Sequence, residues 1–449
     1  MRKRPEHKHL RYVLFRIYVI FIFRLYFPRL FVSGREYVPD EGNPNVMVGC
    51  HQNPFIDPLA PSLVLGTDRR TRGLMRSDIF SVPIISWFLR KLGIMPIARM
   101  DFEGPEAMEK FNHESLTAAA DAIAEGHTLI LFPEAGHQQG RYLGHFTQSY
   151  IRLAFDAAKR HGFKREVYIT PYAHHYANYH HPFYDMMVMF GKPIPLSPYY
   201  KDYADHPRPI RRQITEEVEA QIRNLMLDIS DLPHYNAIDY LRESRFGKDY
   251  CKNNGGDPNH LPDKLASDKK LVAAIEQNKE QDASLLDEMN AFAAKVKKAK
   301  LRDWLFDTRR RGWKLAFGLL LAIILLPLAA VSLALTFPVF LLPYIIKNRP
   351  VNGAYDPMFS STCDVVGTII FTFPIVCVLP AIVLMLCISW WFVFYPIVSL
   401  LMVLFYCRYQ RLCVKVLGLL RFCVTKRHLA QALAKERKTL FDRFRFLGL

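Results

Sequence analysis

Two long runs without a charged residue constrain the fold of this chain more than any other feature. Residues 315–346 give 32 consecutive positions, and residues 365–407 give 43, without Asp, Glu, Lys or Arg. A helix that crosses a bilayer needs about 20 apolar residues. The first run is therefore long enough for one tilted span or a re-entrant hairpin, and the second for two spans. We predict a membrane-embedded helical region over residues 312–407, with the number of crossings left open.

The net charge of +17 is concentrated at the two ends of the 449-residue chain. Residues 1–35 have a net charge of +8 and residues 407–449 one of +9, so the part between them is neutral. Basic segments rich in aromatic residues suit an anionic lipid surface. We predict a basic amphipathic interfacial helix region over residues 1–35, with one helix at 10–32, and a basic amphipathic tail over residues 408–449. No nucleic-acid-binding motif accompanies the charge, so nucleic acid is not an expected partner.

Short apolar runs alternate with helical stretches in residues 36–230. This alternation predicts an α/β domain, a mixed sheet flanked by helices. Residues 231–311 are rich in Lys, Ala and Glu and are interpreted as a charged helical linker. The expected strands are 46–48, 93–97, 128–132, 167–169 and 186–190, and the expected helices of the α/β domain are 106–124, 148–161 and 209–229.

Polar side chains suited to proton transfer and phosphate binding follow three of these strands. His51 and Asp57 come after the first strand; an Asp can hold one ring nitrogen while the other takes a proton from an alcohol. Arg99 comes after the second, and a guanidinium group matches phosphate oxygens. Glu134 and Gly136 follow the strand at 128–132, where an ionised carboxylate accepts hydrogen bonds. We expect these side chains to converge on one cleft.

In order and spacing, these segments resemble the blocks of the glycerolipid acyltransferase family, over roughly residues 40 to 200. The blocks are the His–Asp pair, the segment 93–99 ending in Arg99, Phe-Pro-Glu at 132–134, and a later strand with Pro171. His-x5-Asp is one residue longer than the commonest spacing. It is similar to that of the fungal-type glycerol-3-phosphate acyltransferases, which also place hydrophobic spans after the catalytic domain. Ala135 departs from the usual Gly of the third block.

The resemblance implies an enzyme that transfers a fatty acyl group from acyl-CoA or acyl carrier protein to glycerol 3-phosphate, in phosphatidic acid biosynthesis. His51 would be the general base and Asp57 its orienting partner. The alternative acceptors are 1-acylglycerol 3-phosphate and dihydroxyacetone phosphate. The chemistry requires no metal or cofactor. The substrate-binding candidates are Arg99, Glu134 and Gly136, with Arg76 and Arg141 as secondary phosphate ligands.

A non-enzymatic alternative is a lipid-binding protein that remodels membranes, since basic ends and proline-broken hydrophobic segments fit that role as well. In either case we expect an integral membrane protein. By the positive-inside rule the basic tail faces the cytoplasm. The α/β domain precedes the spans without an evident export signal, so we expect it on the same side, which requires an even number of crossings.

Cysteine and histidine usage gives no sign of a metal site. The eight Cys include no Cys-x-x-Cys pair and lie mostly in apolar runs, as small hydrophobic residues of a reducing compartment do. The pairs at 174–175 and 180–181 are His-His dipeptides without a carboxylate at helical spacing. We interpret them as loop or surface residues.

Overall fold

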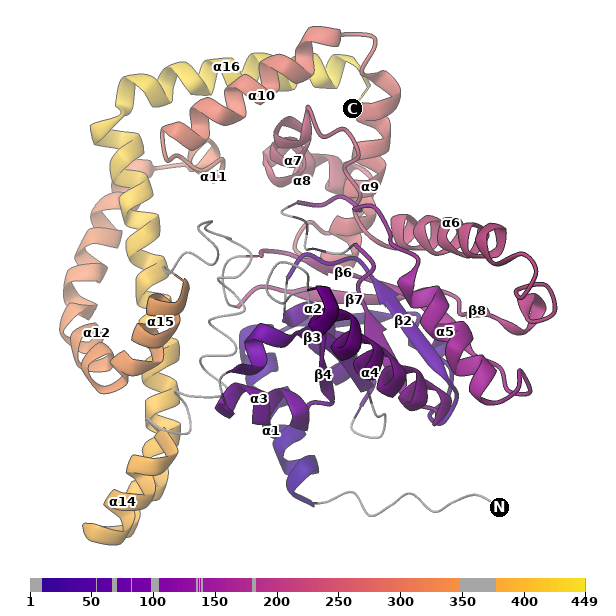
Figure 1. The fold of residues 1–449 in the computed structure, drawn as a ribbon. Coiled ribbons are helices and arrows are strands. Elements are labelled where there is room, and N and C mark those ends of the chain that lie inside the picture. Colours follow the sequence, from indigo (N-terminus) through magenta and orange to yellow (C-terminus); the bar gives the residue numbers. More distant parts are fainter. Residues whose placement is uncertain are drawn as a thin grey trace. The chain divides into compact units, whose positions relative to one another are not determined.

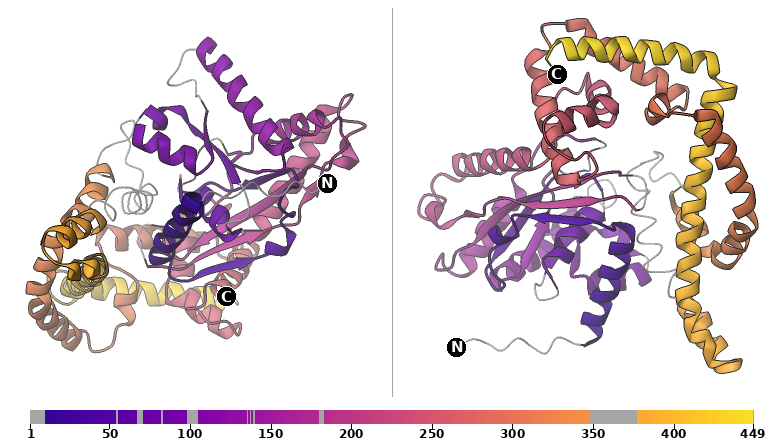
Figure 2. Two further views of the ribbon diagram at one scale, coloured as in Figure 1. Left: turned by 90° about the horizontal axis from the view of Figure 1, so that it is seen from below. Right: turned by 180° about the vertical axis from the view of Figure 1, so that it is seen from behind.

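The computed structural model describes residues 10–448 apart from 54, 67–70, 82, 98–104, 135, 137, 139, 180–182 and 348–376. The chain forms two compact units, one made mainly of the residues up to Asp228 and the other mainly of the residues from Ile229. We call the part up to Asp228 the sheet unit and the part from Ile229 the helical unit. Each is described by itself (Figures 1 and 2).

The sheet unit is built on a mixed sheet of eight strands in its described residues, in the order β1-β7-β6-β2-β5-β3-β4, with β8 paired to β6. β2 is parallel to both β5 and β6, β3 is parallel to β4 and β5, and β6 and β7 are antiparallel. The predicted mixed sheet is confirmed. The strands are β1 (Leu30–Ser33), β2 (Asn45–Gly49), β3 (Thr71–Arg76), β4 (Ile94–Ile97), β5 (Thr128–Leu131), β6 (Tyr168–Tyr176), β7 (Met186–Phe190) and β8 (Ile194–Pro195).

Helices cover the sheet as the alternating pattern predicted. α4 (Pro105–Ala124) packs on β4 and β5, and α5 (Ser149–Arg160) packs on β2, β6 and α4. α6 (Pro207–Leu225) packs on β6. The sequence of α5 explains why this helix packs on the sheet. Its apolar side chains recur at helical spacing and are buried, while its charged residues lie on the outer face. Two shorter helices, α2 (Ile56–Val64) and α3 (Pro83–Lys91), follow β2 and β3.

The predicted helix over residues 10–32 is wrong in its last part. α1 ends at Tyr26, and residues 30–33 form β1, which pairs in parallel with β7. Pro28 explains the end of the helix, because a proline disfavours helical backbone in the residue before it. β3 was not predicted, since Arg72, Gly73 and Arg76 hide its apolar pattern, yet β4 and β5 pair with it on both sides.

α1 is tied to α2 by a buried arginine. Arg16 is 3% exposed, and its guanidinium donates to the carbonyls of Ser62 and Gly66 over 2.7 and 2.8 Å. These carbonyls lie at the C-terminal end of α2, where backbone acceptors lack partners within the helix and a cation is favourable. The position of α2 therefore depends on α1.

Ion pairs hold the polar part of the helical unit together. Arg437 of α16 (Arg427–Phe446) forms ion pairs with Asp303 and Asp307, at 2.7 and 2.8 Å, and so binds α16 to α11 (Trp304–Asp307). Lys295 of α10 (Ala283–Lys298) pairs with Glu436 at 2.7 Å. The prediction that residues 231–311 are helical is confirmed. The remaining helices here are α7 (Tyr235–Glu243), α8 (Arg245–Asn253) and α9 (Leu261–Asn278).

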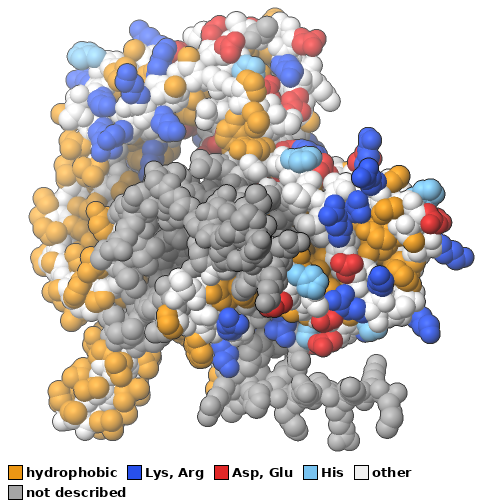
Figure 3. Space-filling model, in the orientation of Figure 1, with side chains coloured by type: hydrophobic (Ala, Val, Ile, Leu, Met, Phe, Trp, Pro, Cys, Tyr) orange, Lys and Arg blue, Asp and Glu red, His pale blue; other side chains and the backbone are white. Residues whose placement is uncertain are grey.

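Two segments of the helical unit, Arg311–Leu341 and Trp390–Thr425, are long and apolar enough to cross a membrane. They contain most of α12 (Arg311–Lys347) and all of α15 (Tyr395–Leu420), which pack along each other; the Tyr409 hydroxyl donates to the Ala322 carbonyl over 3.1 Å. Much of their surface is apolar, as the hydrophobic side chains over α12, α14 (Leu379–Cys387) and α15 in Figure 3 show. The start of the second charge-free run, up to residue 376, lies outside the described residues.

Candidate active site

Parallel strands bring three of the predicted site residues to one edge of the sheet. β2, β5 and β3 are neighbours and run in the same direction. His51 follows β2, Glu134 follows β5, and Arg76 ends β3, so all three lie at the carboxyl edge, where α/β sheets bind ligands. Arg99 follows β4, the next strand in the sheet, but it lies outside the described residues.

His51 and Asp57 contact each other directly. The Nδ1 atom of His51 is 3.2 Å from the Oδ2 atom of Asp57, which lies in the first turn of α2. The carboxylate is fully buried, whereas the His51 side chain is 17% exposed. An Asp bound to Nδ1 fixes the ring tautomer and leaves Nε2, on the opposite side of the ring, to take a proton from a substrate hydroxyl.

The turn between β2 and α2 is built around this carboxylate. The backbone N–H groups of Gln52 and Asn53 both donate to Oδ2 of Asp57 over 2.6 Å. The Asn53 side chain in turn accepts from the N–H groups of Phe55 and Ile56, over 3.2 and 3.0 Å, at the start of α2. An Asn in this place replaces the hydrogen bonds that a helix start lacks. The local sequence therefore supplies several of the hydrogen bonds that hold the His51 loop.

Sequence reasoning missed His174 and Tyr176. The interpretation of His174 and His175 as loop or surface residues is wrong, because both are buried on β6, which runs beyond the predicted strand at 167–169. The Nε2 atom of His174 is 3.0 Å, and the donating hydroxyl of Tyr176 is 2.5 Å, from Oδ1 of Asp57. The available signal was the alternation of Tyr, Thr, Tyr, His and Tyr at every second position from 168 to 176.

The pKa of Asp57 reflects these contacts. Burial alone would raise it, but the charge and hydrogen bond of His174, together with those of His51, hold the pKa well below its usual range. The carboxylate therefore stays ionised throughout the physiological pH range. An ionised partner stabilises the imidazolium that forms when His51 takes a proton.

Glu134 is a buried carboxyl group beside His51. Burial raises its pKa to about 7, although the Gln138 side chain and the backbone of His51 and Gly144 lower it in part. Neither carboxyl oxygen makes a hydrogen bond of normal geometry within the described part of the chain. Gly136, two residues on, is exposed, and a Cβ there would meet no atom of the described residues within 4 Å. This strand end thus carries a buried polar group next to an exposed glycine.

The two secondary phosphate candidates differ in their surroundings. Arg141 is 2% exposed; its guanidinium lies 3.3 Å from Nδ1 of His175 and donates to the Tyr179 hydroxyl and the Tyr176 carbonyl over 3.2 and 3.1 Å. These contacts favour a structural role in holding the end of β6. Arg76 is half-buried at the end of β3, the strand that pairs with β5. Within the described residues, no group of three or more His, Cys, Asp or Glu is arranged to hold a metal ion.

Comparison with known proteins agrees with these motifs. The Acyltransferase family model matches residues 29–175. A chloroplast 1-acyl-sn-glycerol-3-phosphate acyltransferase of Arabidopsis thaliana is 27% identical over 128 residues, 28% of this chain and 33% of the relative. A chloroplast enzyme of the same description from Brassica napus is 26% identical over 123 residues, 27% of this chain and 33% of the relative. Residues 29–175 are thus similar to the Acyltransferase family, and to acyltransferases that act on glycerolipids.

The matched residues span about a third of the length of these curated relatives. Among solved structures, the 1-acyl-sn-glycerophosphate acyltransferase PlsC of Thermotoga maritima is 16% identical, with a TM-score of 0.35 over 50% of this chain and 83% of that chain.

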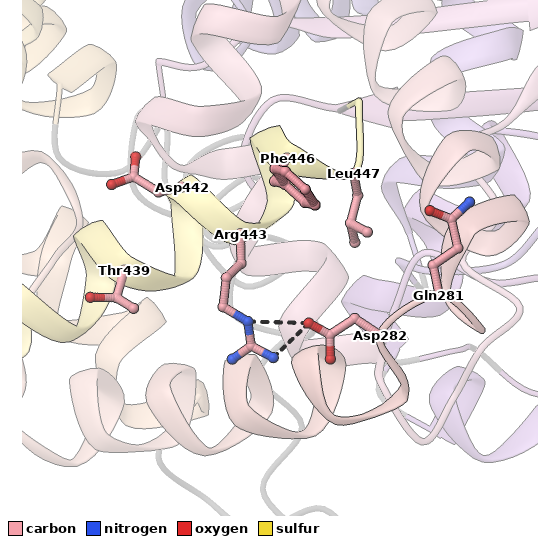
Figure 4. Close-up of a pocket in the computed structure, with 7 residues that line it drawn as sticks. All are labelled: Gln281, Asp282, Thr439, Asp442, Arg443, Phe446 and Leu447. Carbon is pink, nitrogen blue, oxygen red and sulfur yellow. Dashed lines mark hydrogen bonds and ion pairs between the residues drawn. The ribbon is translucent and has the colours of Figure 1, made fainter.

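A cavity of about 480 Å³ lies within the helical unit. Figure 4 shows Arg443 at its centre, with Nη2 and Nε 2.6 and 3.1 Å from the same oxygen of Asp282. The charges of these two side chains neutralise each other, so we assign the cavity to the packing of α10 against α16. Its lining residues are Gln281, Asp282, Thr439, Asp442, Arg443, Phe446 and Leu447.

Proposed function

We propose that this protein transfers a fatty acyl group from a thioester to the free hydroxyl of 1-acylglycerol 3-phosphate, which makes phosphatidic acid at a membrane. The proposal rests on the 3.2 Å contact between His51 and Asp57, beside Glu134, at the carboxyl edge of a sheet in a glycerolipid acyltransferase domain. The names of the relatives favour this acceptor over glycerol 3-phosphate, the first expectation from the sequence. Glycerol 3-phosphate remains the second candidate, because the His-x5-Asp spacing favours it.

In the proposed reaction, Nε2 of His51 removes the proton of the acceptor hydroxyl as its oxygen attacks the thioester carbonyl carbon. A C–O bond forms, and the tetrahedral intermediate collapses with cleavage of the C–S bond. The sulfur leaves as a thiol with the proton that His51 had taken. Asp57 stabilises the imidazolium between these two steps.

Substrate binding is assigned to the neighbouring strand ends. Glu134 accepts a hydrogen bond from the acceptor or donates one, depending on its protonation near neutral pH. Arg76, together with Arg99, binds the acceptor phosphate. The acyl donor is acyl-CoA or acyl carrier protein, and no metal or cofactor takes part in this scheme.

We also propose that the protein is embedded in the membrane and that its catalytic domain and basic tail face the cytoplasm. The segments Arg311–Leu341 and Trp390–Thr425 supply two crossings, which place both ends on one side. α1 supports contact of the sheet unit with lipid, because Leu14, Ile17 and Phe21 are exposed at a spacing that puts them on one helix face.

Membranes that contain the protein test this function. Each acyl donor would be supplied separately, with labelled 1-acylglycerol 3-phosphate or glycerol 3-phosphate as acceptor. His51→Ala should abolish transfer, and His113→Ala, at an exposed position of α4, should not. Transfer to glycerol 3-phosphate alone would replace the proposed acceptor with the second candidate. Undiminished transfer by His51→Ala would refute the mechanism, and no transfer to any acceptor would favour the lipid-binding alternative.

A further inference from the structure

Two histidines share the carboxylate of Asp57. Nδ1 of His51 lies 3.2 Å from Oδ2, and Nε2 of His174 lies 3.0 Å from Oδ1. The His174 side chain has no exposed surface, whereas that of His51 has some. His174 therefore lies behind the carboxylate and acts on a substrate only through Asp57 and His51.

The position of His174 is fixed by the sheet. β6 lies between β2 and β7, and the backbone of His174 pairs with Val188 of β7. The strand's pleat puts Tyr172 and Tyr176 on the same side as His174, and all three side chains are buried. The Nδ1 atom of His174 is buried and makes no hydrogen bond within the described residues. Nε2, which faces Asp57, is thus its hydrogen-bonding atom there.

Each oxygen of Asp57 is held by a separate set of donors. Oδ2 accepts from the N–H groups of Gln52 and Asn53, and Oδ1 accepts from Tyr176 and His174. A carboxylate held in this way cannot rotate when His51 gains a proton. Its negative charge is also shared between two imidazoles, which weakens its pull on the His51 proton.

We propose that His174 is a positioning residue for acyl transfer: it donates Nε2–H to Asp57, fixes the carboxylate toward His51, and limits how strongly the carboxylate holds the His51 proton. The inference rests on the proposed function for its kinetic consequences but not for its geometry. The other titratable groups that face this pair are Cys50 and His51 after β2, Glu134 after β5, and Tyr172 and Tyr176 on β6.

Two substitutions separate positioning from packing. His174→Phe keeps a ring but removes the donor, and His174→Gln keeps a donor near the position of Nε2. His175→Gln is the matched control, since His175 is buried on the same strand but contacts Arg141. Values of kcat, of KM for each substrate, and of kcat/KM against pH would be measured for the three variants and the unaltered protein.

We expect His174→Phe to lower kcat about 10-fold, as the loss of an orienting partner does at other sites, with little change in KM. The acidic limb of its kcat/KM profile, which reports the base in the free enzyme, should move to higher pH by about one unit or less. The limb moves upward because Asp57, with one donor fewer, stabilises the His51 imidazolium more strongly. His174→Gln should recover most of kcat, and His175→Gln should leave the limb in place.

A fall in kcat without movement of the limb, or a Gln variant no better than the Phe variant, would reduce His174 to a packing residue. An NMR titration of histidine-labelled protein gives a test that needs no turnover. The pKa of His51 should be higher in His174→Phe than in the unaltered protein, and equal values would overturn the proposal. If acyl transfer were absent, the proposed function would fail while this titration still decided the role of His174.

Discussion

Phe132 lies face to face with His51, with ring centroids 4.1 Å apart and ring planes 17° apart. Phe132 follows β5, and His51 follows β2, the strand beside it. The Gln138 N–H also donates to the His51 carbonyl over 2.7 Å. The segment that follows β5 thus contacts His51 through both a stacked ring and a backbone hydrogen bond.

Phe132→Leu should lower kcat by about 3- to 10-fold, because an aromatic pair contributes roughly 0.5–1.5 kcal/mol beyond the area it buries. Phe132→Tyr keeps the stacked ring and should retain most of the activity. Acyl-transfer rates at saturating substrate would measure both. Equal rates for the Leu and Tyr variants would show that stacking does not orient His51.

Asp57→Asn should lower kcat by about 10³- to 10⁴-fold, the size of the effect where a neutral amide replaces the aspartate of a catalytic triad. The amide cannot select the productive tautomer of His51. Its NH₂ group would also face N–H donors, so thermal unfolding should shift to lower temperature. Activity within tenfold of the unaltered enzyme would contradict the assigned role.

Glu134→Gln should stabilise the protein at neutral and alkaline pH while impairing turnover. The pKa of Glu134 is about 7 in the folded protein against 4.5 for an unperturbed glutamate, so ionisation is costlier in the folded state. The folded state keeps its full stability below the unfolded pKa and loses part of it as pH rises through the folded pKa. Above pH 7 the variant should gain roughly 3 kcal/mol. Melting temperatures from pH 4 to 9 would test this: a constant difference between the two proteins would disprove it.

Arg16→Ala should destabilise the sheet unit by about 1.5–3 kcal/mol, because it removes charged donors from two carbonyls at the end of α2. Arg24→Ala is the matched control, since Arg24 is an exposed residue of the same helix. Thermal unfolding in a mild detergent would compare the two variants. A larger loss for Arg24→Ala would show that the contact between α1 and α2 matters less than the charge of α1.

Ile323→Arg should weaken membrane integration, because Ile323 is 67% exposed on α12 within a candidate span. An arginine at the centre of a span costs roughly 2.5–3.5 kcal/mol on insertion scales. Extraction with alkaline carbonate should release more of this variant than of the Ile323→Leu control. Equal release would place this part of α12 outside the bilayer.

The elements that sequence predicted well have a strong pattern of their own. β2, β5 and β7 are short apolar runs with clear ends, and the apolar face of α5 recurs at helical spacing. The His51–Asp57 contact could be predicted because six residues and one turn bring the two side chains together. The roles of the site residues stay predictions until activity is measured.

β6 shows why other parts of the fold and site were not predicted. The sequence at its middle is typical of a strand end, since Pro171 lacks an N–H and two histidines follow. In the sheet, Pro171 lies where the neighbour of β6 changes from β8 to β7, and its carbonyl accepts from Gly191 on that side over 2.8 Å. The missing N–H therefore breaks no ladder bond. Only the pairing of β6 with its neighbouring strands shows that the strand continues past Pro171 and that His174 is buried.

The contacts of Asp57 also set when the site can form. Its partner His51 is six residues away, but Tyr176, which donates to its other oxygen, is 119 residues away along the chain. Contacts between distant residues are formed late in folding, after the loop between them has closed. A nascent chain that ends before β6 has the base and its carboxylate without the support behind them. The proposed acyl transfer would thus require a chain in which synthesis and folding have already completed the central sheet.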